Sequence, residues 1–272
     1  MPELPEVETV RRDLAGALAG AVVAKVEASG ARSIRRYRDA APFVASLEGA
    51  RLETFCRWGK YLLIGLDTGR VLVAHLRMSG QLLIAAPPAP PRPPHTHVVL
   101  DFEDGRQLRF VDPRTFGELF VTTPELPELA GLGVDALALD LPTFRGLLRS
   151  RRARLKPLLL DQRVVAGIGN IYSDEILWTA RLRWYRRADH LRPVEVARLH
   201  GAIGSVLTSA VQHRGSSLGD AQYVDLQGRP GAYQERHAVY GREGGACVRC
   251  GHVIERTVVA QRSHFWCRGC QR

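Results

Sequence analysis

The chain begins MPELPEVETV, which places a proline directly after the initiator methionine, with two carboxylates close behind it. Methionine aminopeptidase commonly removes Met1 before a proline, and the mature chain would then begin with the secondary amine of Pro2. An α-amino group has a pKa of about 7.7–8.0 against about 10.4 for lysine, and the start of a helix lowers it further, so much of this amine is neutral. Pro2 is a candidate nucleophile, with Glu3 beside it as an acid and Glu6 one turn on along the same face. Alternatively, all three are ordinary first-turn residues of a helix, where proline and glutamate are common.

The C-terminal tail carries two C-x-x-C pairs separated by sixteen residues. This spacing is typical of one structural Zn²⁺ held by four thiolates. Disulfides and an iron–sulfur cluster are the alternatives, but the cytoplasm is reducing. The predicted ligands are Cys247, Cys250, Cys267 and Cys270, and they leave His252 and His264 outside the coordination sphere. The fifth cysteine, Cys56, lies in a β-type run, and we expect a buried, inert thiol.

A second group of residues is suited to binding phosphate. The segment GIGN, ending at Asn170, joins two helical patterns, and glycines before a helix let backbone N–H groups approach an anion. Asn170 could cap the helix or reach a phosphate with its amide. Lys156 lies nearby in a basic stretch, and Arg262 lies between the two cysteine pairs. These basic residues predict contacts with a nucleic-acid backbone.

The composition agrees with such a partner. The 272 residues include 38 basic and 28 acidic side chains, for a net charge of +10, which favours a polyanionic ligand. Ribosomal and membrane-surface proteins can carry the same charge. No apolar run is long enough for a transmembrane helix, and the acidic N-terminus lacks the features of a signal peptide. We therefore expect a cytoplasmic protein.

The elements that must position these residues follow from the hydrophobic pattern. Apolar residues recur at spacings of three and four over residues 2–18, which predicts an amphipathic helix. Short β-type runs between about residues 21 and 121 predict an antiparallel sandwich or barrel, and helical patterns follow. We expect an α+β, multidomain fold. Its predicted domains are a helix and β-sandwich over 1–134, a helical domain over 135–228, and a metal-stapled hairpin over 229–272.

Several blocks occur in the order that one family shows. They are MPELPEVETVRR, RWGKYLL, HLRMSG, DPRTFG, LLLDQRVVAGIGNIYSDEIL and AQRSHFWCRGCQ, and together they span the chain. The sequence resembles the formamidopyrimidine-DNA glycosylases, bacterial enzymes that excise oxidised purines such as 8-oxoguanine and formamidopyrimidines. The resemblance implies a helix–two-turn–helix DNA-binding domain, a C-terminal zinc finger, and a bifunctional glycosylase and abasic-site lyase of base excision repair.

The resemblance also implies roles for particular residues. Pro2 would attack C1′ of the damaged nucleotide, and the resulting Schiff base would allow β,δ-elimination at the abasic site. Glu3 would act as general acid and Lys60 would contact the lesion or its phosphate. Side chains at two loop tips would wedge into the base stack. The expected catalytic set is Pro2, Glu3, Lys60 and Arg262, and the expected DNA contacts are Glu6, His75, Met78, Arg114, Phe116, Lys156, Asn170 and Tyr223.

The resemblance further implies the partners and the alternatives. We expect double-stranded DNA containing oxidised bases, one structural Zn²⁺, no small-molecule cofactor, no membrane, a monomer, and a cytoplasmic, nucleoid-associated location. The sister branch, resembling endonuclease VIII, removes oxidised pyrimidines and usually begins PEGPE, whereas this chain has PELPE. A non-catalytic DNA-binding zinc protein is the other alternative. The segment GSSLGDAQ departs from the family pattern, so the lesion ranking stays open; we expect Gly215 and Gly219 to leave it mobile until a lesion binds.

Overall fold

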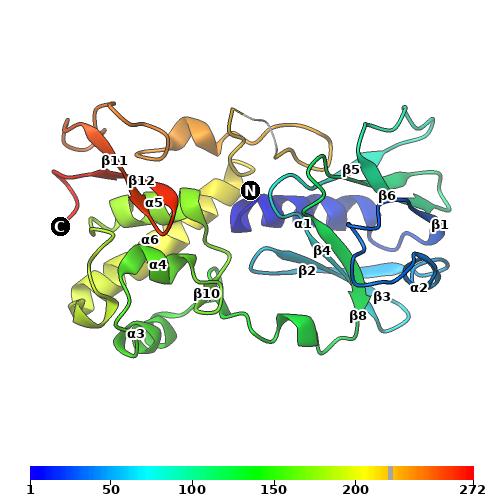
Figure 1. The fold of residues 1–272 in the computed structure, drawn as a ribbon, viewed down its shortest axis with the longest axis horizontal. Helices are drawn as coiled ribbons and strands as arrows, with labels where there is room; N and C mark the ends of the chain where they lie inside the picture. The colour runs from blue at the N-terminus through cyan, green and yellow to red at the C-terminus, as the bar shows by residue number, and fades with distance from the viewer. Residues whose placement is uncertain (220–222) are drawn as a thin grey trace. The chain divides into compact units, whose positions relative to one another are not determined.

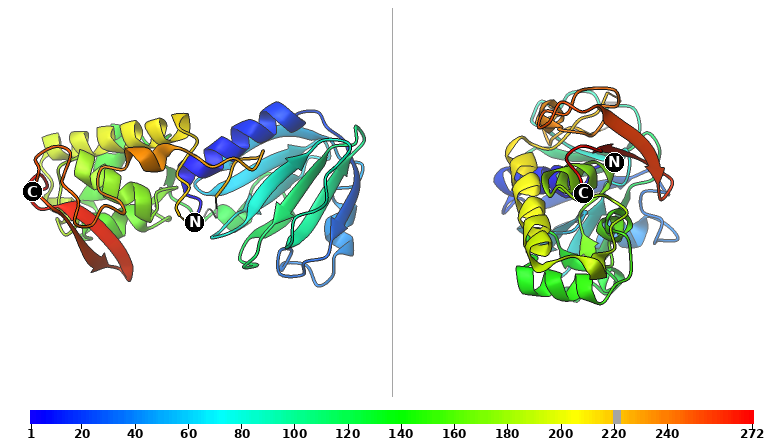
Figure 2. Two further views of the ribbon diagram at one scale, coloured as in Figure 1. Left: turned by 90° about the horizontal axis from the view of Figure 1, so that it is seen from above. Right: turned by 90° about the vertical axis from the view of Figure 1, so that its left-hand side faces the viewer.

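The computed structural model describes residues 1–219 and 223–272 and divides into two compact units. The first unit comprises Met1–Ala130 and His213–Ala232, and the second comprises Gly131–Gln212 and Tyr233–Arg272. The elements of each unit can be followed along the chain in Figure 1 and from two further directions in Figure 2. In the part of the chain described here, no helix has both the length and the apolar character needed to cross a membrane.

The first unit is a β-sandwich with a helix, as the hydrophobic pattern predicts. One antiparallel sheet has the order β1 (Val23–Ala28), β6 (Thr96–Phe102), β7 (Gln107–Val111) and β5 (Gln81–Ala85). The other has the order β2 (Leu52–Trp58), β3 (Tyr61–Leu66), β4 (Val71–His75) and β8 (Glu118–Thr122). The helix α1 (Leu4–Leu18) contacts β2, and the short elements α2 (Ala41–Ala45) and η1 (Pro127–Leu129) complete this unit.

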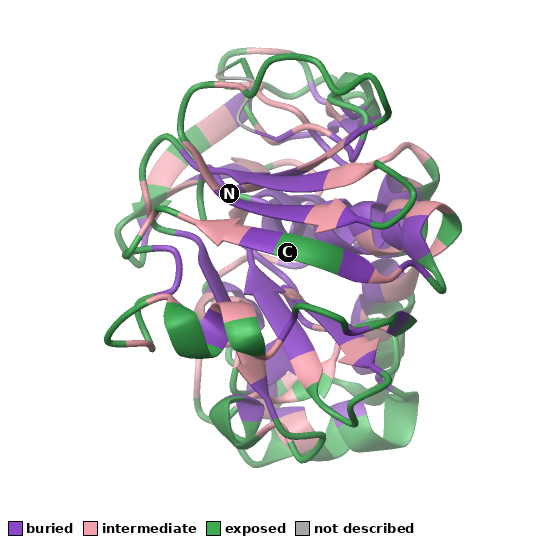
Figure 3. Ribbon diagram, turned by 90° about the vertical axis from the view of Figure 1, so that its right-hand side faces the viewer, coloured by how far each residue is buried: buried purple, intermediate pink, exposed green. Residues whose placement is uncertain are grey.

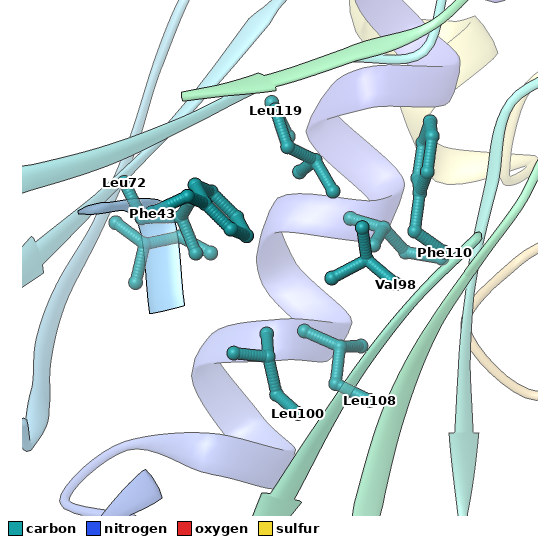
Figure 4. A pocket seen from close by; sticks show the side chains of 10 residues that line it. Phe43, Leu72, Val98, Leu100, Leu108, Phe110 and Leu119 are labelled. Atoms are coloured by element: carbon teal, nitrogen blue, oxygen red, sulfur yellow. The ribbon is translucent and has the colours of Figure 1, made fainter. Parts of the chain in front are cut away.

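The space between the two sheets is a filled core. Figure 4 shows side chains from both sheets and from α2 pointing toward one another. They leave an internal cavity of only about 10 Å³, lined by residues that include Phe43, Leu72, Val98, Leu100, Leu108, Phe110 and Leu119. Many residues of the strands are buried, and exposed residues are frequent in the loops (Figure 3). A cavity this small leaves no room for a ligand, so the functional residues of this unit lie at its edges.

Residues 213–232 belong to the sandwich unit, whereas the sequence analysis placed 213–228 in the helical domain. The carbonyl of Leu226 accepts a hydrogen bond from the backbone N–H of Ile84 in β5, at 2.9 Å. Arg214 forms ion pairs with Asp13 of α1, at 2.5 Å, and with the buried Asp225, at 2.7 Å. These contacts join residues far apart in sequence, so local patterns did not reveal them.

The second unit contains the predicted helices and the hairpin of the tail. Its elements are β9 (Val134–Asp135), α3 (Leu141–Arg149), α4 (Leu155–Leu160), β10 (Val165–Ala166), α5 (Asn170–Thr179), η2 (Ala188–His190), α6 (Pro193–Gln212), η3 (Tyr233–Arg236), β11 (Ile254–Val259) and β12 (Arg262–Cys267). The strands β9 and β10 pair in parallel, and β11 and β12 form an antiparallel hairpin.

The sequence analysis set residues 229–272 apart as a domain, and in the structure residues 233–272 share one compact unit with the helices. The helix α5 binds this part of the chain directly. The buried carboxylate of Glu175 accepts hydrogen bonds at 2.8–3.0 Å from three consecutive backbone N–H groups, those of Ala238, Val239 and Tyr240. Burial raises the pKa of Glu175, and these three donors oppose that shift.

Candidate functional site

The start of α1 is organised by Glu6, which is 1 % exposed. Its Oε2 accepts a hydrogen bond from the backbone N–H of Glu3 at 2.7 Å, and its Oε1 accepts one from the backbone N–H of Ser216 at 2.8 Å. Glu3 is 3 % exposed, and Pro2 is also buried. The carboxylate of Glu6, expected to contact DNA, therefore holds two backbone segments, and its geometry is that of a positioning residue.

The segment after Arg214 comes very close to this carboxylate. Gly215 has a φ of +77°, and a Cβ placed on it would lie 2.6 Å from Glu6 Oε1. Glycine is thus required here for close approach, a role different from the mobility predicted from the sequence. Nothing lies within 4 Å of a Cβ placed on Gly219, and Asp220 lies outside the described residues.

Tyr223 is anchored on the other side of this segment. Its hydroxyl donates to the carbonyl of Arg214 at 2.9 Å, and its backbone carbonyl accepts from Ser217 Oγ at 2.7 Å. The side chain is 6 % exposed. Burial and the nearby charge of Glu6 raise the pKa of the Tyr223 phenol, so it stays a neutral donor.

Lys60 and His75 lie in the second sheet, at the β2–β3 turn and at the end of β4, and each is 6 % exposed. The Nδ1 of His75 accepts from the backbone N–H of Arg77 at 3.0 Å, which leaves the proton of the neutral ring on Nε2. Burial, together with the positive charges of Arg77 and Lys60, lowers the pKa of His75 to about 3. A neutral His75 can still donate one hydrogen bond to a phosphate oxygen.

The turn that carries Lys60 is tied to α1 through a residue that the sequence analysis missed. Glu8 accepts hydrogen bonds from Arg11, Arg12 and Arg57, and Arg57 in turn donates to the carbonyl of Gly59 at 2.9 Å. Glu8 is 8 % exposed. The available signal was the spacing of Glu8 from Arg11 and Arg12, three and four residues on along the helix, which favours an ion pair.

Met78, Arg114 and Phe116 are exposed, as expected for a wedge. Met78 and Phe116 are 38 % and 41 % exposed, and the guanidinium of Arg114 lies 4.8 Å from the centre of the Phe116 ring. The two loops meet at the fully buried Asp112, which accepts hydrogen bonds from the side chain of Ser79 and from the backbone N–H groups of Arg114 and Gly117. The sequence analysis missed Asp112, although an aspartate before a proline and a turn indicates such a role.

In the second unit, the GIGN turn differs from the expectation. The N-cap of α5 is Gly169, and Asn170 is the first helical residue. The Nδ2 of Asn170 donates to the carbonyl of Ser263 at 3.0 Å. Lys156 is 0 % exposed, forms an ion pair with Asp174, and donates to the same carbonyl at 3.3 Å. The structure thus places Lys156 in the interior of this unit, where its ammonium does not lie on a surface that could contact a phosphate directly.

Arg262 begins β12 and is exposed. Among the described residues its guanidinium has no hydrogen-bond or ion-pair partner. The two residues before it, Ala260 and Gln261, have φ angles of +47° and +61°, which is the geometry of a tight two-residue hairpin turn. Arg262 therefore stands at the tip of the hairpin with its charge available to an anion.

The four cysteines of the tail converge as the spacing predicts. Their Sγ atoms all lie within 4.8 Å of one another, and the contacts between pairs are 3.2–3.6 Å. A disulfide needs about 2.05 Å, whereas thiolates about 2.3 Å from one Zn²⁺ lie at separations close to these. Trp178 Nε1–H donates to the Sγ of Cys247 at 3.4 Å, a contact that stabilises a thiolate there.

The fifth cysteine corrects one expectation. Cys56 in β2 is exposed, not buried. His264 lies outside the thiolate cluster, as expected, and its ring contacts Asp174.

Comparison with known proteins gives the family. Three family models match in order: the N-terminal domain of formamidopyrimidine-DNA glycosylase over residues 1–119, its H2TH domain over 132–222, and a zinc finger found in FPG and IleRS over 244–272. The formamidopyrimidine-DNA glycosylase of Heliobacterium modesticaldum is 44 % identical over the full length of both chains. The chain belongs to the formamidopyrimidine-DNA glycosylase family.

Solved structures of this family have the same fold. The MutM (Fpg) protein of Thermus thermophilus matches with a TM-score of 0.87 and 43 % identity, covering 99 % of this chain and 98 % of that one. Lactococcus lactis Fpg in complex with DNA containing an abasic site matches with a TM-score of 0.90 and 34 % identity over 99 % of each chain. The expected fold class and the zinc site are confirmed, and the protein is a DNA glycosylase and abasic-site lyase for oxidised purines in base excision repair.

Proposed function

We propose that this glycosylase uses the nitrogen of Pro2 as its nucleophile on duplex DNA that contains an oxidised purine. Once Met1 is removed, the neutral amine attacks C1′ of the damaged nucleotide, and the C1′–base bond breaks as the base leaves with a proton. Glu3 donates a proton to the ring oxygen as the sugar opens. The resulting iminium accepts the electrons released by loss of a 2′ proton, and the 3′ and then the 5′ phosphate depart by elimination.

One observation carries this assignment. Pro2 and Glu3 lie directly before the first turn of α1, and the backbone of Glu3 is held by the buried carboxylate of Glu6. Positive charge is disfavoured at this end of a helix, which favours the neutral amine that the attack requires.

The DNA contacts that we propose come from both units. Met78, Arg114 and Phe116 enter the base stack, where the two loops joined by Asp112 present them as one surface. Lys60 and neutral His75 contact the phosphate or the sugar at the lesion, and Arg262 contacts the phosphate backbone from the hairpin tip. Lys156 and Asn170 act indirectly, through the carbonyl of Ser263. We further propose that the enzyme acts as a monomer on chromosomal DNA in the bacterial cytoplasm.

The test is borohydride trapping on a duplex with 8-oxoguanine opposite cytosine. Wild-type protein whose first residue is shown by mass spectrometry to be Pro2 should form a covalent protein–DNA species. Pro2→Gly should reduce the rate of strand cleavage at least tenfold and should still bind the duplex, and protein that retains Met1 should not be trapped. Trapping that is equally efficient with Met1 retained would rule out the amine of Pro2 as the nucleophile.

A further inference from the structure

We propose that Asp174 is a positioning residue that fixes the strand bearing Arg262 against α5, and that His264 completes this attachment. The inference rests on the proposed contact between Arg262 and the phosphate backbone. Arg262 is exposed and has no partner of its own among the described residues, so its position for DNA depends on what holds its strand.

The carboxylate of Asp174 binds two consecutive residues of β12. Its Oδ2 accepts from the backbone N–H of Phe265 at 2.9 Å, and its Oδ1 accepts from His264 Nδ1 at 2.6 Å. Asp174 and His264 are each 0 % exposed. One side chain on α5 therefore holds both the backbone and a side chain of the strand.

The residue directly after Arg262 is held in the same way. The carbonyl of Ser263 accepts from Asn170 Nδ2 and from Lys156 Nζ. Ser263 and Phe265 are two apart, so their backbone groups point to the same edge of β12, away from its partner β11. Side chains from α4 and α5 thus occupy the edge where a third strand would otherwise pair. A two-stranded hairpin is marginally stable alone, and this edge contact fixes its position.

Asp174 also carries the negative charge that pairs with Lys156. Lys156 is fully buried beside it, and a buried ammonium without a counter-charge is strongly destabilising. Burial lowers the pKa of His264, so the ring is neutral; its Nδ1–H then donates to Asp174, and Nε2 is buried with no partner among the described residues. Asp174→Asn preserves the shape of the side chain, removes the counter-charge of Lys156, and weakens the contacts to His264 and Phe265 together.

A double-mutant cycle tests whether Asp174 acts through Arg262. We would measure the affinity of Asp174→Asn, Arg262→Ala and the double variant for a duplex with an abasic-site analogue, over a series of salt concentrations. Each single variant should bind several-fold more weakly, and each should flatten the log–log salt slope by about one. In the Arg262→Ala background, Asp174→Asn should change affinity by less than about twofold, because the contact it supports is already absent. The loss should appear in KM more than in kcat.

Three controls separate positioning from general damage. Asp189→Asn removes one carboxylate from the same unit, where it pairs with Arg187 on the surface, and should bind DNA as the wild type does. Every variant should retain one zinc per chain, and the Phe265 amide should exchange faster with solvent in Asp174→Asn.

If Asp174→Asn fails to fold, two variants of His264 replace it. His264→Leu lacks the donor and should weaken DNA binding. His264→Asn has an Nδ2–H that can replace Nδ1–H, and it should retain DNA binding.

The inference would be overturned if Asp174→Asn and Arg262→Ala reduced duplex affinity independently, so that their fold-changes multiplied in the double variant. Wild-type affinity in Asp174→Asn would overturn it too. Unchanged affinity and slope in Arg262→Ala would overturn it as well, since β12 would then position nothing for DNA. Borohydride trapping of these variants on lesion DNA distinguishes that result from a failure of the proposed chemistry, which depends on Pro2.

Discussion

The carboxylate of Glu6 accepts a hydrogen bond from the backbone N–H of Ser216, 210 residues further along the chain. The same carboxylate accepts from the backbone N–H of Glu3 at 2.7 Å. One buried side chain thus joins the proposed catalytic end of α1 to the segment that precedes residues 220–222. The position of Glu3 and the position of this segment are therefore coupled.

Glu6→Gln tests this coupling. An amide keeps one oxygen acceptor but turns its NH₂ toward one of the two backbone donors, and a buried N–H left without an acceptor costs about 1–3 kcal/mol. We expect a lower melting temperature for the sandwich unit and a fall in the single-turnover rate of base excision, with duplex affinity retained. Glu53→Gln, an exposed change in β2, is the matched control. Unchanged excision and melting in Glu6→Gln would show that the two hydrogen bonds are dispensable.

Removal of zinc should affect more than the hairpin. Cys267→Ser should release the metal, and because Asp174 and Glu175 of α5 bind the tail, hydrogen exchange should increase in α5 as well as in β11 and β12. Exchange in the strands of the sandwich should not change, since they belong to the other unit. Cys56→Ser should retain one zinc per chain. Metal analysis that finds iron, or no metal, in the wild type would contradict the assignment of zinc.

The stability of the sandwich should fall at acid pH because of His75. Its pKa is lowered to about 3 in the folded protein, whereas the unfolded chain titrates near about 6.5. The neutral ring makes its full contribution to the free energy of unfolding above about pH 6.5, and this contribution is lost as the pH falls from about 6.5 toward 3. His75→Asn keeps an acceptor for the Arg77 N–H but cannot titrate, so its free energy of unfolding should decline less between pH 7.5 and 5.

The measurement for His75 is urea unfolding followed by hydrogen exchange of sandwich peptides at the two pH values. His95→Asn is the control, because His95 is exposed and its φ of +64° suits asparagine. The free energy of unfolding of His95→Asn should decline between pH 7.5 and 5 as much as that of the wild type. A parallel decline in His75→Asn would assign the acid sensitivity to other groups.

The enzyme should excise a broad range of oxidised purines. Pro2 and Glu3, the proposed chemical groups, lie outside the divergent segment 215–222, in which Gly215 and Ser216 contact the carboxylate of Glu6. Variation beyond Ser216 should therefore change selectivity before it changes chemistry. We expect 8-oxoguanine opposite cytosine and ring-opened formamidopyrimidines both to be excised, the second with less dependence on context. Single-turnover rates on matched duplexes would measure this. Faster excision of thymine glycol than of either purine lesion would favour the endonuclease VIII branch instead.

The sequence by itself determined the features that depend on local spacing. Two C-x-x-C pairs predict a tetrathiolate zinc site, and the structure brings the four Sγ atoms together. Apolar periodicity predicted α1 and the strands of the sandwich, because the repeats of helix and strand differ along the chain. The order of the blocks indicated the family, and the comparisons confirm it.

Only the tertiary structure decided which polar side chains are exposed and which are buried where they hold the scaffold. Lys156 was expected at a phosphate and is buried against Asp174, and Glu6 was expected at DNA and binds Ser216. Asp112, Glu8 and Asp174 were not singled out, although each is buried and accepts several hydrogen bonds. In the sequence, a charged residue at the surface cannot be distinguished from a charged residue in the interior. Its role depends on donors supplied from distant segments, because burial is tolerated only where those donors satisfy the charge.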